Sequence, residues 1–421
     1  MMRIIQFCFA ALLILTPGFA ASTNQLIILT TFTKESLQPT LDQFQQHYPE
    51  VRFTILHRRE TSGLRLLEDS QHDIDIVISS SLSLFLPLSQ QNRILPLKAL
   101  NYDSAVQQQR LLPHTLNNVA VFGYSGYGIM WNKDYLAKHQ LQLPSSWEEL
   151  AHPQYFRHLV MSSPSRSGTT HIMVESILQQ HGWKEGWELL LKIGGNLASV
   201  SARSDGVSDV IARGLAGIGP VVDSFAYESQ QQFPFIGFQY QPSSPLLPSY
   251  IAALPNINQA IHTLAFVKYL LSDEVQETLS VSSMNKYALN QEMAQPYDVV
   301  SINHVLMQQR AKLIKILFEQ TINRQLIRLN QAWQLIHEVK KLPHLPPEQQ
   351  RMFNLAVKLA STPPITEFQS KSNTLLQSIS MSPRHIETTQ LARQWQRMMT
   401  DQLEQAIAIC ENIIDEAGKR S

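Results

Sequence analysis

In the first part of the chain, short apolar runs rich in β-branched residues alternate with amphipathic stretches. This alternation limits the possible folds more than any other feature. The expected strands are residues 26–29, 51–56 and 73–78. A helix capped by Thr33 is expected after the first strand, with Leu37 and Phe44 on its apolar face. Strands that alternate with helices form a parallel sheet with right-handed crossovers. The sequence therefore predicts an α/β lobe.

Small polar residues follow each of these strands. Each loop alone is explained by ordinary turn and helix-cap chemistry. In parallel sheets, however, ligands bind beyond the carboxyl ends of the strands, so three such loops at one edge indicate a binding site. The candidate binding residues in these loops are Thr31, Thr33, Ser62, Gly63, Ser79 and Ser80.

The α/β pattern continues in a second region and then gives way to helices. An extended segment at 119–131 and strand-like runs at 159–161 and 216–222 are separated by helical stretches. Beyond Val300 almost the whole chain reads as amphipathic helix. We expect lobe 1 at residues 21–122 completed by 247–299, lobe 2 at 123–246, and a helical C-terminal region at 300–421 packed on the lobes.

The N-terminus has the pattern of a secretory signal peptide. Arg3 precedes an apolar run at residues 4–15, which is too short to span a membrane. Pro17 and small residues up to Ala20 follow, so residues 1–20 are predicted to be removed by cleavage after Ala20. A buried N-terminal helix is the alternative. The protein is therefore expected to be exported.

The composition excludes some classes of protein. The chain has 34 Lys and Arg against 34 Asp and Glu, which argues against nucleic acid or an anionic membrane surface as the main partner. Its two cysteines are Cys8, inside the signal peptide, and Cys410, so no intramolecular disulfide is possible after cleavage. With 44% hydrophobic residues, an apolar core must supply the stability instead.

The stretch SPSRSGTTH, residues 163–171, predicts an anion site at a helix N-terminus. The first turn of a helix has unpaired N–H groups and a positive dipole end, and no acid occurs in this turn to occupy them. A plain helix cap with a surface arginine is equally compatible with this stretch alone. The candidate binding residues are Arg166, Ser167, Gly168, Thr169 and Thr170.

Catalytic and metal motifs are missing from the sequence. No lysine follows the glycine of SPSRSGTTH, which excludes a nucleotide P-loop. A serine hydrolase with Ser125 or Ser167 as nucleophile is disfavoured, because Tyr127 stands where a nucleophile elbow needs glycine. The histidines show no metal-ligand spacing. We therefore expect no enzyme activity, no metal and no cofactor.

A second group of polar residues lies on the two sides of a predicted helix and the strand that comes after it. Ser201, Arg203 and Ser204 precede the helix, so Arg203 is a second potential anion contact. Asp223 follows the next strand. A carboxylate beside an anion site suits a ligand that also carries hydroxyl groups, although Asp223 could equally be a helix cap.

Five stretches taken together carry a family resemblance: PSSWEEL, SPSRSGTTHIMVE, GWKEGWELLLKIGGN, VIARGLAGIGPVVD and AFVKYLLSDEVQETL. They resemble the periplasmic solute-binding proteins of ABC transporters, in the branch that holds ferric-ion and hexose-phosphate binders. The resemblance implies a periplasmic protein with the two-lobed type II α/β fold, whose lobes close on a ligand by a hinge motion. It places one crossover between the lobes at residues 126–131 and the return at 243–251.

The resemblance also narrows the ligand. Iron-binding members carry adjacent tyrosines just after the strand that here ends at Val222, whereas this chain has Ser224 and Phe225 there, with Tyr227 alone. Sugar-phosphate members carry an aspartate followed by an aromatic pair, which Asp223 and Phe225 match in part. The implied ligand is a small phosphorylated organic anion of the phosphoglycerate or phosphoenolpyruvate class. A hexose-phosphate or ferric-ion component of an ABC transporter is the alternative.

The resemblance further implies a membrane partner. The expected partner is a sensor kinase whose system induces phosphoglycerate transport, with an ABC permease as the alternative. We expect the protein to be a monomer.

Overall fold

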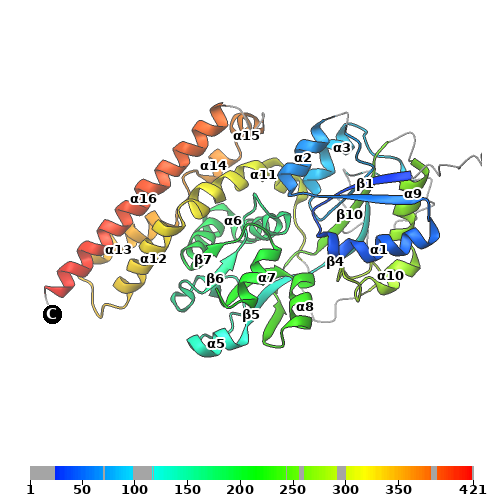
Figure 1. The fold of residues 1–421 in the computed structure, drawn as a ribbon. Helices are drawn as coiled ribbons and strands as arrows, with labels where there is room; N and C mark the ends of the chain where they lie inside the picture. Colours follow the sequence, from blue (N-terminus) through cyan, green and yellow to red (C-terminus); the bar gives the residue numbers. More distant parts are fainter. Residues whose placement is uncertain are drawn as a thin grey trace, which may run out of the picture.

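The computed structural model describes residues 24–69, 72–97, 116, 118–242, 244–255, 260–291, 300–380 and 386–419. The predicted signal peptide, residues 1–20, lies outside them. Within the described residues, the strands form two five-stranded sheets, each covered by helices, and a long helical segment follows at the C-terminal end (Figure 1). The two-lobed α/β fold with a helical C-terminal region is thereby confirmed.

Lobe 1 contains the sheet with the strand order β2-β1-β3-β10-β4. Its strands are β1 (Asn24–Thr30), β2 (Val51–His57), β3 (Ile76–Ser79), β4 (Ala120–Ser125) and β10 (Leu247–Ala253). Strands β2 and β3 run parallel to β1, and β10 runs antiparallel to both β3 and β4. The helices of this lobe are α1 (Lys34–His47), α2 (Glu60–Glu68), α3 (Leu86–Gln90), α9 (Ala260–Leu270) and α10 (Asp273–Thr278), with a 3-10 turn η1 (Leu82–Leu84).

Burial on both faces explains why these runs form strands. Leu26 and Ile28 pack on one face of the sheet with α1 and α9, whereas Leu29 and Val77 pack on the opposite face. Side chains of a strand alternate between the two faces, so a run of consecutive apolar residues suits a sheet covered on both sides.

Lobe 2 repeats this plan with the strand order β7-β6-β8-β5-β9. Its strands are β5 (Tyr127–Asn132), β6 (Leu159–Met161), β7 (Leu197–Val200), β8 (Ile218–Val222) and β9 (Ile236–Tyr240). Strands β7 and β8 run parallel to β6, and β5 runs antiparallel to β8 and β9. Strand β5 therefore takes the place in lobe 2 that β10 takes in lobe 1.

The helices of lobe 2 are α5 (Lys133–His139), α6 (Gly168–Gly195), α7 (Asp205–Ala212) and α8 (Asp223–Gln232), with 3-10 turns η3 (Glu149–Ala151) and η4 (Pro153–Tyr155). Helix α6 is interrupted at Gly182, whose φ of 79° is left-handed and favours glycine. The residues on either side of Gly182 therefore form two helical stretches.

The chain crosses from lobe 1 to lobe 2 at Gly126, between β4 and β5, and returns between β9 and β10. Both connections are short, and in the first one Gly126 is the single residue between β4 and β5. The two sheets are therefore joined by a narrow segment that can act as a hinge.

The helical C-terminal region, called the tail below, packs mainly on lobe 2 (Figure 1). Its elements are α11 (His304–Phe318), a π-helical turn (Glu319–Asn323), α12 (Leu326–Lys340), α13 (Pro347–Ser361), α14 (Glu367–Ser370), α15 (Asn373–Ser380) and α16 (Ile386–Gly418). Helices α11, α12 and α13 contact α6, and α16 lies along α12 and α13. Among the described residues, none of the helices combines the length and the apolar character needed to cross a membrane.

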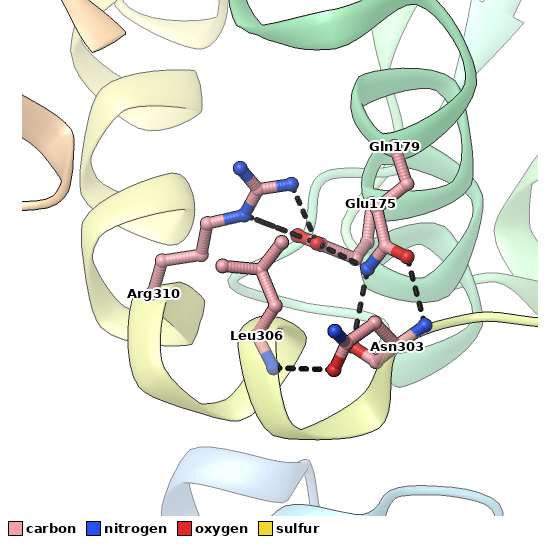
Figure 2. Close-up of polar contacts among 5 residues, drawn as sticks. All are labelled: Glu175, Gln179, Asn303, Leu306 and Arg310. Carbon is pink, nitrogen blue, oxygen red and sulfur yellow. Dashed lines mark hydrogen bonds and ion pairs between the residues drawn. The ribbon is translucent and has the colours of Figure 1, made fainter. Parts of the chain in front are cut away.

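A buried ion pair fixes α11 to lobe 2 (Figure 2). Arg310 on α11 donates through Nη2 to Glu175 Oε1 at 2.7 Å and through Nε to both carboxylate oxygens at 3.0 and 3.2 Å. Gln179, one turn along α6, donates to the same Glu175 carboxylate and accepts from the Asn303 N–H at 2.8 Å. Asn303 in turn caps α11 by accepting from the Leu306 N–H at 3.0 Å. The first turns of α11 are therefore specified by α6.

The other end of α11 reaches lobe 1. Lys315 forms an ion pair with Glu60, the first residue of α2. Burial alone would raise the pKa of Glu60, but the Lys315 ammonium outweighs it and holds the pKa at about 2. Helix α11 therefore contacts both lobes through buried ion pairs, and Glu60 stays ionised at neutral pH.

The Arg310 pair gives a prediction about stability. Arg310→Met leaves the Glu175 carboxylate, which has no solvent exposure, without its cation. We expect the free energy of unfolding to fall by about 3–5 kcal/mol. The double variant Glu175→Leu/Arg310→Met removes both charges and should recover most of this loss, because an apolar replacement of a buried pair is often neutral. Urea denaturation measures both, and a double variant as unstable as the single one would contradict the assignment.

Candidate functional site

An open cavity lies between the two lobes. Most of its wall is made by the loops after β1, β2 and β3 of lobe 1 and by the loops after β6, β7 and β8 of lobe 2. The start of β10 and the segment after α10 complete it. The loops lie at the carboxyl ends of the parallel strands in each sheet, where open α/β sheets bind ligands. Because the two lobes have the same topology, the carboxyl ends of three strands from each lobe face the same cavity.

The N-termini of α6 and α7 meet in the lobe 2 wall. Ser167 caps α6 by accepting from the Thr170 N–H at 3.1 Å, and the first turn of α6 contains no acid. The Ser167 hydroxyl also lies 2.8 Å from that of Thr169 and 2.5 Å from that of Ser204, which precedes α7. Two helix N-termini and three hydroxyl groups therefore present hydrogen-bond donors to the cavity.

Cations outnumber carboxylates in the cavity wall. The described cationic residues are Arg58, Arg59, Arg166, Arg203 and Lys286, and the described carboxylates are Glu60, Asp205 and Glu228. Glu60 is already paired with Lys315. Among the residues that the structure describes, the guanidinium groups of Arg59 and Arg166 have no ion pair or side-chain hydrogen bond. The wall therefore has a positive excess that suits an anionic ligand.

Contacts across the cavity bring the lobes together. Arg203 of lobe 2 donates to His57 Nε2 of lobe 1 at 3.1 Å. Burial, followed by the charge of Arg203, lowers the pKa of His57, so its ring is neutral and can accept this bond. Gly168 approaches lobe 1 so closely that a Cβ atom there would lie 3.0 Å from Ser81 Cβ. A larger residue at this position would require Ser81 to shift by a few tenths of an ångström.

Eight of the thirteen predicted binding residues line the cavity: Thr31, Thr33, Ser80, Arg166, Ser167, Gly168, Thr169 and Arg203. The structure places five outside its wall: Ser62, Gly63, Ser79, Thr170 and Asp223. Ser79 supports the wall from behind, because its hydroxyl bonds that of Thr31 at 2.8 Å and accepts from the Ser81 N–H at 3.0 Å. Gly63 faces Leu29 and Leu84 in the core of lobe 1, and the Thr170 N–H serves the cap of α6.

Asp223 lies at the crossing between the lobes and has no solvent exposure. Its carboxylate accepts from the Gly126 N–H at 2.5 Å, the Ser224 N–H at 2.7 Å and the Tyr240 hydroxyl at 3.1 Å. Burial raises the pKa of Asp223 to about 6 in spite of these bonds and of the nearby Lys286 charge. These hydrogen bonds connect Asp223, the first residue of α8, to Gly126 at the crossing between the lobes.

Two further tyrosines surround Tyr227, which the sequence shows as an isolated tyrosine. Its hydroxyl lies 2.8 Å from that of Tyr240 and 3.4 Å from that of Tyr287, and the last two are 3.1 Å apart. Burial raises the pKa of Tyr227 and of Tyr240, which keeps both phenols neutral. The cluster joins lobe 2 to the segment after α10, which pairs with β4 of lobe 1, and lies outside the cavity wall.

Lys286 is a wall residue that the sequence analysis missed. Its ammonium donates to the Ser125 hydroxyl at 2.8 Å and to the Ser224 hydroxyl at 3.5 Å. Lys286 follows α10 with no motif around it, and the pairing of Tyr287 with Tyr124 beside β4 places it in the wall. Ser125, one of the two candidate nucleophiles, has no solvent exposure. His57 and Ser81 were also missed, since neither belongs to a recognisable motif in the sequence. Ser204 was noted beside Arg203 but was not named as a binding residue.

Known solute-binding proteins and a transport regulatory protein have a similar sequence or fold. Residues 73–303 match the family described as bacterial extracellular solute-binding protein. The phosphoglycerate transport regulatory protein PgtC of Salmonella typhimurium is 33% identical over 368 residues, which cover 84% of this chain and 91% of that protein.

Solved structures of periplasmic binding proteins share the fold. AfuA from Actinobacillus pleuropneumoniae, solved with fructose-6-phosphate bound, matches 76% of this chain and all of its own chain, with a TM-score of 0.58 at 14% identity. Iron-bound HitA from Pseudomonas aeruginosa matches 67% of this chain and 91% of its own, with a TM-score of 0.54 at 13% identity.

The segment that matches the family runs from the approach to β3 to the residue before α11. It contains the whole sheet of lobe 2 and strands β3, β4 and β10 of lobe 1, with the wall loops after β3, β6, β7 and β8, whereas the wall loops after β1 and β2 lie outside it. This chain belongs to the bacterial extracellular solute-binding protein family.

Proposed function

We propose that this protein binds a small phosphorylated organic anion, of the phosphoglycerate or phosphoenolpyruvate class, in the cavity between its lobes. The observation that carries the proposal is the unpaired Arg166 guanidinium beside the N-termini of α6 and α7. A phosphate there would accept from backbone N–H groups, from hydroxyls and from a guanidinium fork.

The expected affinity follows from these contacts. Charge-assisted hydrogen bonds contribute about 1.5–3 kcal/mol each, and a helix N-terminus contributes up to about 2 kcal/mol. A few of them reach the roughly 8 kcal/mol that corresponds to micromolar binding. Arg203 of lobe 2 already contacts His57 of lobe 1, so a ligand between these loops would be held by both lobes.

The location and the role are proposed from the relatives. The protein would work in the periplasm after removal of residues 1–20. The name of its Salmonella relative suggests a role in the regulation of phosphoglycerate transport. In this proposal the protein would report its occupancy to a membrane sensor kinase whose system induces that transport. Delivery of a hexose phosphate to an ABC permease is the second candidate, favoured by the fructose-6-phosphate-bound relative of the same fold.

Ligand class can be tested by thermal unfolding of the purified protein. A ligand that binds the folded state stabilises it by about 2.7 kcal/mol at roughly one hundred times its Kd. We expect 3-phosphoglycerate or phosphoenolpyruvate to raise Tm, and D-glycerate, which has no phosphate, to leave it unchanged. A rise with glucose 6-phosphate alone would favour the second candidate. A rise with ferric citrate alone would assign the protein to the iron binders.

Replacement of the two lobe 2 arginines tests the position of the anion. Arg166→Ala and Arg203→Ala should each weaken binding of 3-phosphoglycerate by about 10–100-fold, the effect of one charge-assisted contact. Arg213→Ala is the matched control, because Arg213 directly follows α7, is exposed and is absent from the cavity wall. Calorimetric titration gives the Kd values. Unchanged affinity in both cavity variants would place the anion elsewhere.

A genetic experiment separates signalling from delivery. In a host whose phosphoglycerate transporter is expressed from a constitutive promoter, deletion of this protein should leave uptake intact. Under the natural promoter, the same deletion should abolish induction of the transporter. Loss of uptake under the constitutive promoter would assign the protein to delivery instead.

A further inference from the structure

Lys286 is a buried cation in the cavity wall that has no carboxylate partner. It is 7% exposed, and its ammonium contacts the hydroxyls of Ser125 and Ser224 and lies 5.2 Å from the centre of the Phe32 ring. Throughout the described part of the chain, no carboxylate oxygen comes within 4.0 Å of it. The neighbouring Asp223 directs its oxygens to Gly126, Ser224 and Tyr240 instead.

An ammonium in this position is costly to keep. Taking a charge out of water costs several kcal/mol unless a partner of opposite charge compensates it. Burial lowers the pKa of Lys286 to about 8, with the charge of Asp223 opposing the shift, so the group stays mostly protonated at neutral pH. Two hydroxyls and an aromatic ring solvate the charge without neutralising it. The charge of Asp223 offsets part of this cost without touching the ammonium, so an anion in the cavity, which Lys286 lines, would add a direct partner.

Lys286 and Arg166 occupy different parts of this wall. Lys286 lies where β4 ends and α8 begins, next to the crossing between the lobes. Arg166 precedes α6, whose first residue faces Ser81 and Glu60. The cavity therefore has cations at two places, and an elongated ligand with one anionic group at each end would contact both.

We propose that Lys286 binds the carboxylate of a ligand whose phosphate is bound at Arg166 and the N-terminus of α6. The cavity would then select phosphorylated carboxylic acids over phosphorylated alcohols and sugars. The inference rests on the proposed function and adds to it the residue that determines specificity.

The test compares two ligands that differ in the carboxylate. Calorimetric titration with 3-phosphoglycerate and with glycerol 3-phosphate, which lacks the carboxylate, gives both Kd values. The unmodified protein should bind 3-phosphoglycerate at least about 10-fold more tightly. Lys286→Met should weaken 3-phosphoglycerate by about 10–100-fold and leave glycerol 3-phosphate within about twofold. Lys268→Met, an exposed site on α9 outside the cavity, is the control and should change neither.

The outcomes separate this inference from the proposed function. Equal affinity of the unmodified protein for the two ligands overturns the role of Lys286 while phosphate binding stands, and this result needs no variant. An equal loss for both ligands in Lys286→Met also overturns it, because a general or structural effect would explain that loss. If no phosphorylated compound binds, the proposed function fails, and the inference fails with it.

Discussion

The buried pair between Arg310 and Glu175 is the interaction on which the arrangement of the C-terminal half depends. Glu175 lies on α6, the helix whose first turn faces the cavity and whose later turns carry α12 and α13. A buried carboxylate needs its cation, so α11 has little freedom in where it docks on α6. Because Asn303 and Gln179 complete the same network, the start of α11 is fixed by hydrogen bonds as well as by charge. The position of the tail is therefore set by the same helix that builds the proposed anion site.

The cavity contains residues of both lobes because the two sheets have the same strand arrangement. Each lobe directs its parallel strand ends, and the helix N-termini that follow them, into the same space. Lobe 2 supplies Arg166, Arg203 and a cluster of hydroxyls, whereas lobe 1 supplies Arg58, Arg59 and Lys286. A small anion held from both sides would replace the repulsion between these facing cations with attraction, so binding and lobe closure would favour each other.

Local sequence patterns could predict the parts of the structure that depend on local physics. Residue periodicity locates strands and helices, and the strand-end rule brings residues such as Thr31, Ser80 and Arg166 to one cavity. Contacts between distant segments could not be predicted in this way. Lys286 reaches the wall through the pairing of Tyr287 with Tyr124, and Asp223 turns to Gly126 across the crossing. Tyr227 gains two phenol neighbours from separate segments for the same reason. The spacing of residues along the chain does not predict these contacts between distant segments. The ligand roles assigned to the wall residues stay predictions.

Helix α11 spans the two lobes with one ion pair at each, Arg310 to lobe 2 and Lys315 to lobe 1. The two pairs are little more than one helical turn apart, so a short rigid stretch of α11 connects two lobes that a hinge allows to rotate. Rotation of lobe 1 about the hinge would therefore act on Lys315 through Glu60, a residue of the cavity wall. The tail is held to lobe 2 by Arg310 and by the contacts of α12 and α13 with α6, so the Lys315–Glu60 pair is the contact of α11 that opening of the cavity would load.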